Sequence, residues 1–218
     1  MQDFQLVTGM VIHQDPVGDY DRRIVLLTKD SGKISAFAKG ARRPNSKYVS
    51  TTDLFCFGDF KLYAGRDSFT VTDVSIKNYF SEIRADLDAS LYRMYFLDVV
   101  ECNTRQFNDE LNILRLLYSS VKALGREDIP NSLVKLIFEF KLYFLQGEFA
   151  IKEEWRRRYK LSTIYTLEFI GNTKPEKLYS FSVSDEVMKE LVVIAKEAKR
   201  QLLPASFKSE EMLKIVEI

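Results

Sequence analysis

The chain has 218 residues, of which 46% are hydrophobic and 29% are charged. This length allows one large domain or two small ones, and the scarcity of Pro and Gly excludes a low-complexity linker or tail. The net charge of +1 excludes a globally basic nucleic-acid binder, so the protein could bind a polyanion only through a local patch of cations.

The first 78 residues predict short strands separated by turns. The strands are expected at residues 5–12, 23–28, 34–38, 56–64 and 69–77, with a polar loop, D-P-V-G-D-Y-D, at residues 15–21. Turns at residues 30–33 and 65–67 indicate two hairpins. Five strands with one long irregular connection favour a small closed barrel of the OB-fold type, because a sandwich usually needs about seven strands.

From residue 81 onward the hydrophobic period becomes helical. Gly125 ends one predicted helix and Pro130 opens the next, residues 131–146, which is apolar nearly all round and should be central and buried. Ser184 resembles an N-cap, and a last short helix should start near Ser209. The fold class is therefore α+β: a five-stranded OB-fold β-barrel in residues 1–80, followed by an all-α helical domain in residues 81–218.

Neither the cysteines nor the apolar segments indicate export or a membrane. Cys56 and Cys102 are too few for a disulfide framework, and the first residues lack the pattern of a signal peptide. The most apolar stretch, residues 133–145, contains three charged residues and is too short to span a bilayer. We expect a soluble, cytoplasmic protein with no membrane partner.

The sequence offers no positive sign of catalysis. His13 is the only histidine, and no G-x-S-x-G, P-loop or G-x-G-x-x-G motif is present. His13 is expected to be a partly exposed residue at the end of the first strand. Neither cysteine lies in a C-x-x-C pair, which argues against zinc. We expect no enzyme, no cofactor and no metal.

One segment carries a concentrated positive charge. Between Arg22 and Lys47 there are eight Lys and Arg residues against a single acid, Asp30. Residues 38–50, A-K-G-A-R-R-P-N-S-K-Y-V-S, form a loop whose cations suit phosphate groups. The candidate phosphate contacts are Lys39, Arg42, Arg43 and Lys47. The alternative is a basic loop that only keeps the protein soluble.

An aromatic side chain lies beside this basic segment. Alternation places Ile34, Ala36 and Ala38 on one face of their strand and Phe37 on the other. Phe37 could therefore stack on a base, although it could equally pack against the helical domain. Tyr63, on the same face as Lys61, is a weaker candidate of this type.

A second basic cluster, W-R-R-R-Y-K, occupies residues 155–160 in the helical half. It could extend a DNA path or bind an acidic peptide. Because two glutamates and a lysine precede it, a solvated surface helix is the preferred interpretation.

Several of these segments are similar to the RecO family of DNA repair proteins. The similarity lies in T-G-M-V-I-H at residues 8–13, in residues 21–28, and above all in A-F-A-K-G-A-R-R-P-N-S-K at residues 36–47. It continues more weakly through residues 91–101, 133–147, 176–181 and 207–209. The resemblance implies DNA contact at Lys39, Arg42, Arg43 and Lys47, and less securely at Arg22 and Arg23.

The resemblance also implies a recombination mediator that binds single- and double-stranded DNA, anneals complementary strands and assists recombinase loading. The implied partners are RecR and the acidic C-terminal tail of single-stranded DNA-binding protein, in the bacterial cytoplasm at the nucleoid. Many family members carry a four-cysteine zinc site after the long helix, but residues 147–170 contain no cysteine. The alternatives are an RNA-binding, translation-associated OB-fold module and an adaptor that binds acidic peptides.

Overall fold

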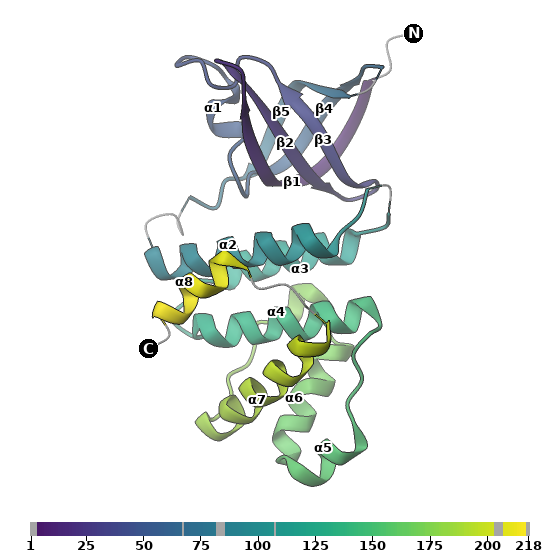
Figure 1. The fold of residues 1–218 in the computed structure, drawn as a ribbon, viewed down its shortest axis with the longest axis vertical. Coiled ribbons are helices and arrows are strands. Elements are labelled where there is room, and N and C mark those ends of the chain that lie inside the picture. The colour runs from purple at the N-terminus through teal and green to yellow at the C-terminus, as the bar shows by residue number, and fades with distance from the viewer. Residues whose placement is uncertain (1–3, 67, 82–85, 107, 203–206, 217–218) are drawn as a thin grey trace. The chain divides into compact units, whose positions relative to one another are not determined.

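The computed structural model describes residues 4–66, 68–81, 86–106, 108–202 and 207–216. The chain forms two compact units, Met1–Glu82 with Leu97–Leu114 and Ile83–Phe96 with Arg115–Ile218. The first unit holds all the strands together with α1 (Tyr48–Thr51) and part of the helical chain, and the second unit is helical (Figure 1).

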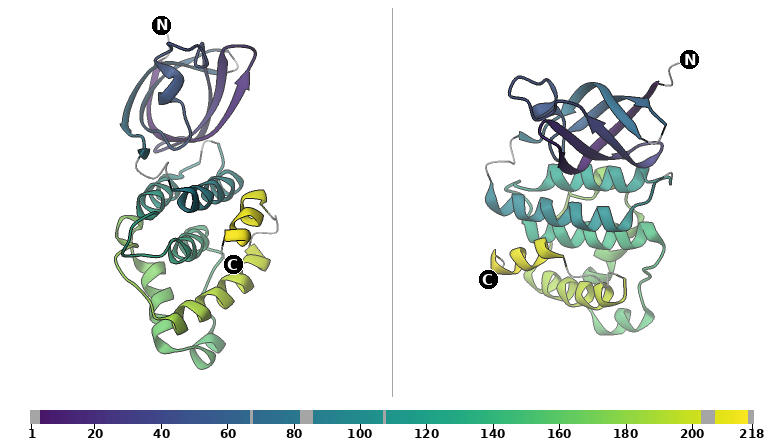
Figure 2. Two further views of the ribbon diagram at one scale, coloured as in Figure 1. Left: turned by 90° about the vertical axis from the view of Figure 1, so that its left-hand side faces the viewer. Right: turned by 45° about the horizontal axis from the view of Figure 1, so that its top comes forward.

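The first unit contains a closed five-stranded barrel. Its strand order is β1-β2-β3-β5-β4, with β4 paired back to β1; β3 and β5 pair in parallel and the other neighbours are antiparallel. Figure 2 shows the barrel from two further sides. This is the topology of the OB-fold, and it confirms the predicted fold class. The strands are β1 (Phe4–Val17), β2 (Asp21–Thr28), β3 (Gly32–Ala38), β4 (Phe57–Ala64) and β5 (Phe69–Asn78), with a short helix α1 (Tyr48–Thr51) between β3 and β4.

The barrel interior follows from the alternation of side chains along each strand. In β3, Ile34, Ala36 and Ala38 are buried, while the intervening side chains are partly exposed. Because successive residues of a strand face opposite sides, one face fills the core and the other meets solvent. The alternation predicted for this strand is confirmed.

The prediction of a loop at residues 15–21 is wrong over most of its length. β1 continues to Val17, and Asp15 and Pro16 pair with Arg23 and Arg22 of β2. The pairing persists because the Asp15 carboxylate binds the Arg23 guanidinium across the two strands at 2.6 Å. His13 therefore lies within β1 rather than at its end, beside a register shift. Its two ring nitrogens lie 3.0 Å from Asp15 and 3.1 Å from Glu101.

The chain after the barrel is helical, as predicted. The helices are α2 (Leu87–Asn103), α3 (Leu111–Ala123), α4 (Asn131–Gln146), α5 (Glu153–Arg158), α6 (Leu161–Asn172), the 3-10 turn η2 (Pro175–Lys177), α7 (Asp185–Leu202) and α8 (Lys208–Val216). Among the helices in the described ranges, none has both the length and the hydropathy required to cross a bilayer.

The long helix α4 is the centre of the second unit. It begins after Pro130 and ends before Gly147, whose φ of +73° lies in the left-handed region that glycine adopts easily. It contacts α6 and α7. Ten of its side chains are buried, including that of Glu139, which accepts a hydrogen bond from the Tyr95 hydroxyl. Burial, followed by the charge of Glu139, raises the pKa of Tyr95, so this hydroxyl remains a donor. The predicted central helix is confirmed.

Candidate nucleic-acid interface

The basic loop of residues 39–47 leaves the end of β3 and is held by backbone contacts. Gly40 adopts a φ of +66°, and its N–H donates to the Asp21 carboxylate at 2.7 Å. The N–H of Arg42 donates to the Tyr20 carbonyl at 2.8 Å, and Ala41 is fully buried. The loop is therefore fastened to the β1–β2 turn by its backbone, which leaves its long side chains available.

All four predicted phosphate-binding cations of this loop are exposed. Arg42 donates one bond to the Gly18 carbonyl at 3.1 Å, and the Arg43 guanidinium lies 5.1 Å from the centre of the Tyr20 ring. Within the described residues, neither these two arginines nor Lys39 has a carboxylate partner. The loop therefore presents positive charge that internal acids do not neutralise.

Lys47 differs from the other three because it has an acidic partner. Its ammonium group lies 2.9 Å from the Asp73 carboxylate on β5, and the two side chains are 63% and 66% exposed. This hydrogen bond raises the pKa of Lys47 and lowers the pKa of Asp73, so both groups are ionised at neutral pH. An ion pair this exposed is weak and screened by salt, and an ammonium group has three donors, so Lys47 can bind a phosphate beside Asp73.

Arg22 and Arg23 are engaged within the barrel. The Arg22 side chain is only 15% exposed and donates to the Asp53 carboxylate at 3.0 Å, as well as to Thr52 and the Val49 carbonyl. It thereby holds residues 49–53 against β2. Arg23 donates twice to Asp15 and lowers the pKa of that carboxyl group. Both arginines therefore help to shape the surface that carries the loop.

Phe37 is half-buried and lines a cavity of about 420 Å³ beside β3. The same cavity is lined by Arg66, from the β4–β5 turn, and by Lys33. Sequence reasoning missed both Arg66 and Tyr20, since each lies in a turn distant in sequence from the basic loop. The sequence signal that could have identified Tyr20 is an aromatic residue in a predicted polar turn, between Asp19 and Asp21.

The second basic cluster is partly neutralised by its neighbours. Trp155 is buried, Arg156 binds Glu168 at 2.7 Å, and Lys160 binds Glu186. Arg157 and Arg158 are exposed beside the glutamates of the same short helix, α5. These contacts favour the interpretation of a surface helix for this cluster.

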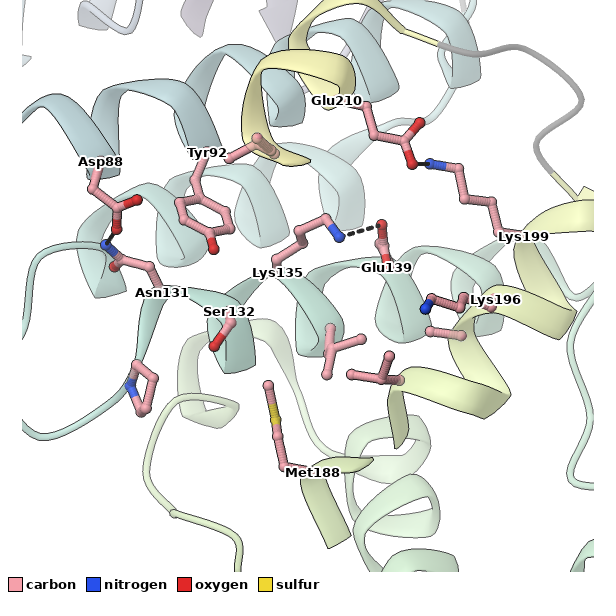
Figure 3. A pocket seen from close by; sticks show the side chains of 15 residues that line it. Asp88, Tyr92, Asn131, Ser132, Lys135, Glu139, Met188, Lys196, Lys199 and Glu210 are labelled. Carbon is pink, nitrogen blue, oxygen red and sulfur yellow. Dashed lines mark hydrogen bonds and ion pairs between the residues drawn. The ribbon is translucent and has the colours of Figure 1, made fainter. Parts of the chain in front are cut away.

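The second unit contains a larger cavity, of about 730 Å³, formed by residues of α4, α7 and α8 among others (Figure 3). Its lining combines apolar side chains, such as Leu136 and Val192, with three lysines and three acids: Lys135, Lys196, Lys199, Asp88, Glu139 and Glu210. Lys135 lies near Glu139, and Lys199 binds Glu210 at 2.5 Å. In the described parts of the chain Lys196 has no carboxylate partner, and it is exposed. The cavity can therefore receive an apolar side chain next to a carboxylate.

Comparison with known proteins gives consistent matches. The family model described as Recombination protein O N terminal matches residues 1–80. A DNA repair protein RecO of Acetivibrio thermocellus is 27% identical, over 96% of this chain and 96% of its own length. The RecO of Clostridium perfringens is 23% identical over 95% of this chain and 96% of its own length. That of Alkaliphilus metalliredigens is 32% identical, over 64% of this chain and 56% of its own length.

Proposed function

Because this chain belongs to the RecO family of DNA repair proteins, we propose that it is a recombination mediator that acts by binding DNA rather than by catalysis. In this proposal residues 1–80 form the DNA-binding domain, which binds both single- and double-stranded DNA. The chain anneals complementary strands and assists recombinase loading together with RecR, in the cytoplasm at the nucleoid.

The observation that supports this proposal is the exposed charge of the basic loop. Three of its four cations have no carboxylate partner among the described residues, and the fourth has only an exposed one. If each of the four cations neutralises one phosphate of a single strand, the logarithm of the binding constant falls with the logarithm of the salt concentration with a slope of about −2.8. This quantity is called the salt slope below. Arg22 and Arg23 contribute by holding this surface in shape, and Phe37 offers a ring to a base.

Competition between nucleic acids separates this proposal from an RNA-binding module. A labelled single-stranded DNA is bound by the protein and displaced by unlabelled DNA or by RNA of the same sequence. We expect DNA to compete at least as well as RNA, because phosphate contacts carry no preference for the 2′-hydroxyl group. Stronger displacement by RNA would favour the RNA-binding alternative.

We further propose that the 730 Å³ cavity binds the acidic C-terminal tail of single-stranded DNA-binding protein. A carboxylate of the tail pairs with Lys196, and an apolar side chain enters the cavity, whose lining includes Leu136 and Val192. This arrangement matches the usual division of a peptide site into an apolar pocket and a few polar contacts that fix orientation.

Charge reversal at Lys196, the exposed lysine of the cavity lining, tests the peptide site. The variant Lys196→Glu should bind a fluorescent peptide of that tail about 10-fold more weakly, because an attractive contact becomes repulsive. The control Lys189→Glu makes the same charge change at an exposed position of α7 that does not line the cavity. Equal peptide affinity of the two variants would place the tail elsewhere.

A further inference from the structure

We propose that the outer face of β1 and β4 is a stacking platform for unpaired bases, which extends the DNA site beyond the basic loop and gives the chain a preference for single strands. This inference rests on the proposed function, and it deepens that function by naming the residues that recognise a single strand.

The platform is built on a pair of aromatic rings from neighbouring strands. The β1–β4 register sets Phe4 directly opposite Tyr63, with ring centres 5.6 Å apart and planes inclined at 57°. The two residues are 46% and 36% exposed, so they form no part of the barrel core. A single exposed apolar side chain is ordinary, but two exposed rings in contact with each other offer an aromatic surface that suits the face of a base.

A cation accompanies the rings. Lys61, which lies opposite Leu6 in the β1–β4 ladder, places its ammonium group 4.8 Å from the centre of the Phe4 ring. It is exposed and, as far as the chain is described, forms no ion pair. A base on a ring with its phosphate beside a lysine is the arrangement that proteins use for single strands of any sequence.

The two acids that the structure describes beside the platform, Asp59 and Asp73, each have a cationic partner. Asp59 accepts bonds from Lys77 at 2.8 Å and from the Thr8 hydroxyl at 2.6 Å, while Asp73 is bound by Lys47. The bond from Lys77 is the largest influence on Asp59 and lowers the pKa of its carboxyl group. Among the described residues Lys61 takes part in none of these pairs, so its charge is available for a phosphate.

The platform is continuous with the basic loop. Lys47 belongs to the loop and binds Asp73 of β5, and Asp73 is the cross-strand partner of Lys61 on β4. Tyr63 lies two residues further along β4 on the same face, roughly 7 Å away, and Phe4 is its neighbour on β1. A single strand of DNA that is bound at Lys47 can therefore continue along the surface of the barrel to Lys61 and then to the rings.

Stacking on a ring distinguishes single strands from duplex. In a duplex both faces of a base are covered by its neighbours, whereas an unpaired base can exchange a neighbour for an aromatic side chain. Such a contact is worth about 5-fold to about 150-fold in affinity per base. The basic loop reads phosphates and serves both forms of DNA, so the rings should change only the affinity for single strands.

The test compares binding of a single strand and of its duplex by the full chain. The variant Phe4→Ala/Tyr63→Ala should lose at least about 25-fold in affinity for the single strand and keep its affinity for the duplex. The variant Phe4→Tyr/Tyr63→Phe, which keeps both rings, should bind as the wild type does. Leu6→Ala removes apolar surface from the same face without removing a ring, and it should also bind normally.

A second measurement does not depend on removing the rings. The chain has one tryptophan, Trp155, which is buried, so a Phe4→Trp variant adds one exposed indole on the barrel. We expect single-stranded DNA to quench the added fluorescence and duplex DNA to leave it nearly unchanged.

The outcomes separate this inference from the function on which it rests. Unchanged single-strand affinity in the ring-free variant, with binding still lost on reversal of the basic loop, would overturn the platform and leave the DNA-binding proposal intact. An equal loss of single-strand affinity in Leu6→Ala would also overturn it, because general apolar contact rather than stacking on the rings would then carry the binding. No DNA binding by the wild type would overturn both.

Discussion

The variant Arg42→Glu/Arg43→Glu/Lys47→Glu is expected to bind DNA at least about 100-fold more weakly than the wild type at low salt. Three of the four exposed cations of the loop are replaced by acids, so three attractive phosphate contacts become repulsive. The loss should be similar for single strands and duplex, because phosphates carry no sequence or strand information. Fluorescence anisotropy with a labelled oligonucleotide measures the effect, and strand annealing should be lost with it.

The fold should survive this change, since all three side chains are exposed and the loop is fastened by the backbone bonds of Gly40 and Arg42. A matched control replaces three exposed lysines of the helical unit by glutamate, which alters the net charge equally: Lys122, Lys174 and Lys177. If the control lost affinity to the same extent, the effect would reflect overall charge, and the loop would have no special part.

The second large effect concerns the folding of the barrel. Gly58 on β4 pairs with Gly9 on β1, and a Cβ at Gly58 would lie 2.3 Å from the carbonyl oxygen of Ser75 and 2.7 Å from the Cα of Ile76. Both are backbone atoms of β5, so β4 and β5 would have to separate. Gly58→Ala should therefore lower the free energy of unfolding by about 3 kcal/mol, the upper part of the range for overpacked cores.

Urea denaturation followed by circular dichroism measures this change. The control is Gly18→Asn, in the β1–β2 turn, where a Cβ meets no atom within 4 Å and asparagine tolerates the φ of +53°. The control should stay within about 0.5 kcal/mol of the wild type. Equal stability of Gly58→Ala and the control would mean that the approach of β5 to β4 is looser than described.

The sequence predicted the architecture because its local signals agree with each other. Alternation in residues 34–38 determined which side of β3 faces the core, and the apolar helix of residues 131–146 has the limits that were predicted for it. Ser184 accepts the bond from the N–H of Val187 expected of an N-cap. The end of β1 was missed because Asp15 and Pro16 are typical of turns, and only pairing with β2 keeps them in the strand.

The candidate site was predictable only in its charges. Clustered cations identify the loop, but the bonds that distinguish them join residues far apart in sequence. Lys47 meets Asp73 across 26 positions, and Arg22 meets Asp53 across 31. Whether an arginine forms an internal ion pair or is available to DNA therefore depends on how the strands pair, and the local sequence does not predict that pairing.

The most direct test of the central claim is a salt titration of DNA binding, with the wild type and the triple reversal measured side by side on one single-stranded oligonucleotide. The four cations of the loop should contribute about −2.8 to the slope of the wild type, so a fourfold increase in salt weakens their share of the binding about 50-fold. In the triple reversal Lys39 alone should contribute about −0.7, or about 3-fold, and Lys61 adds about −0.7 to the slope of both proteins. Equal slopes for the two proteins would mean that DNA is held by other cations and that the basic loop is not the interface.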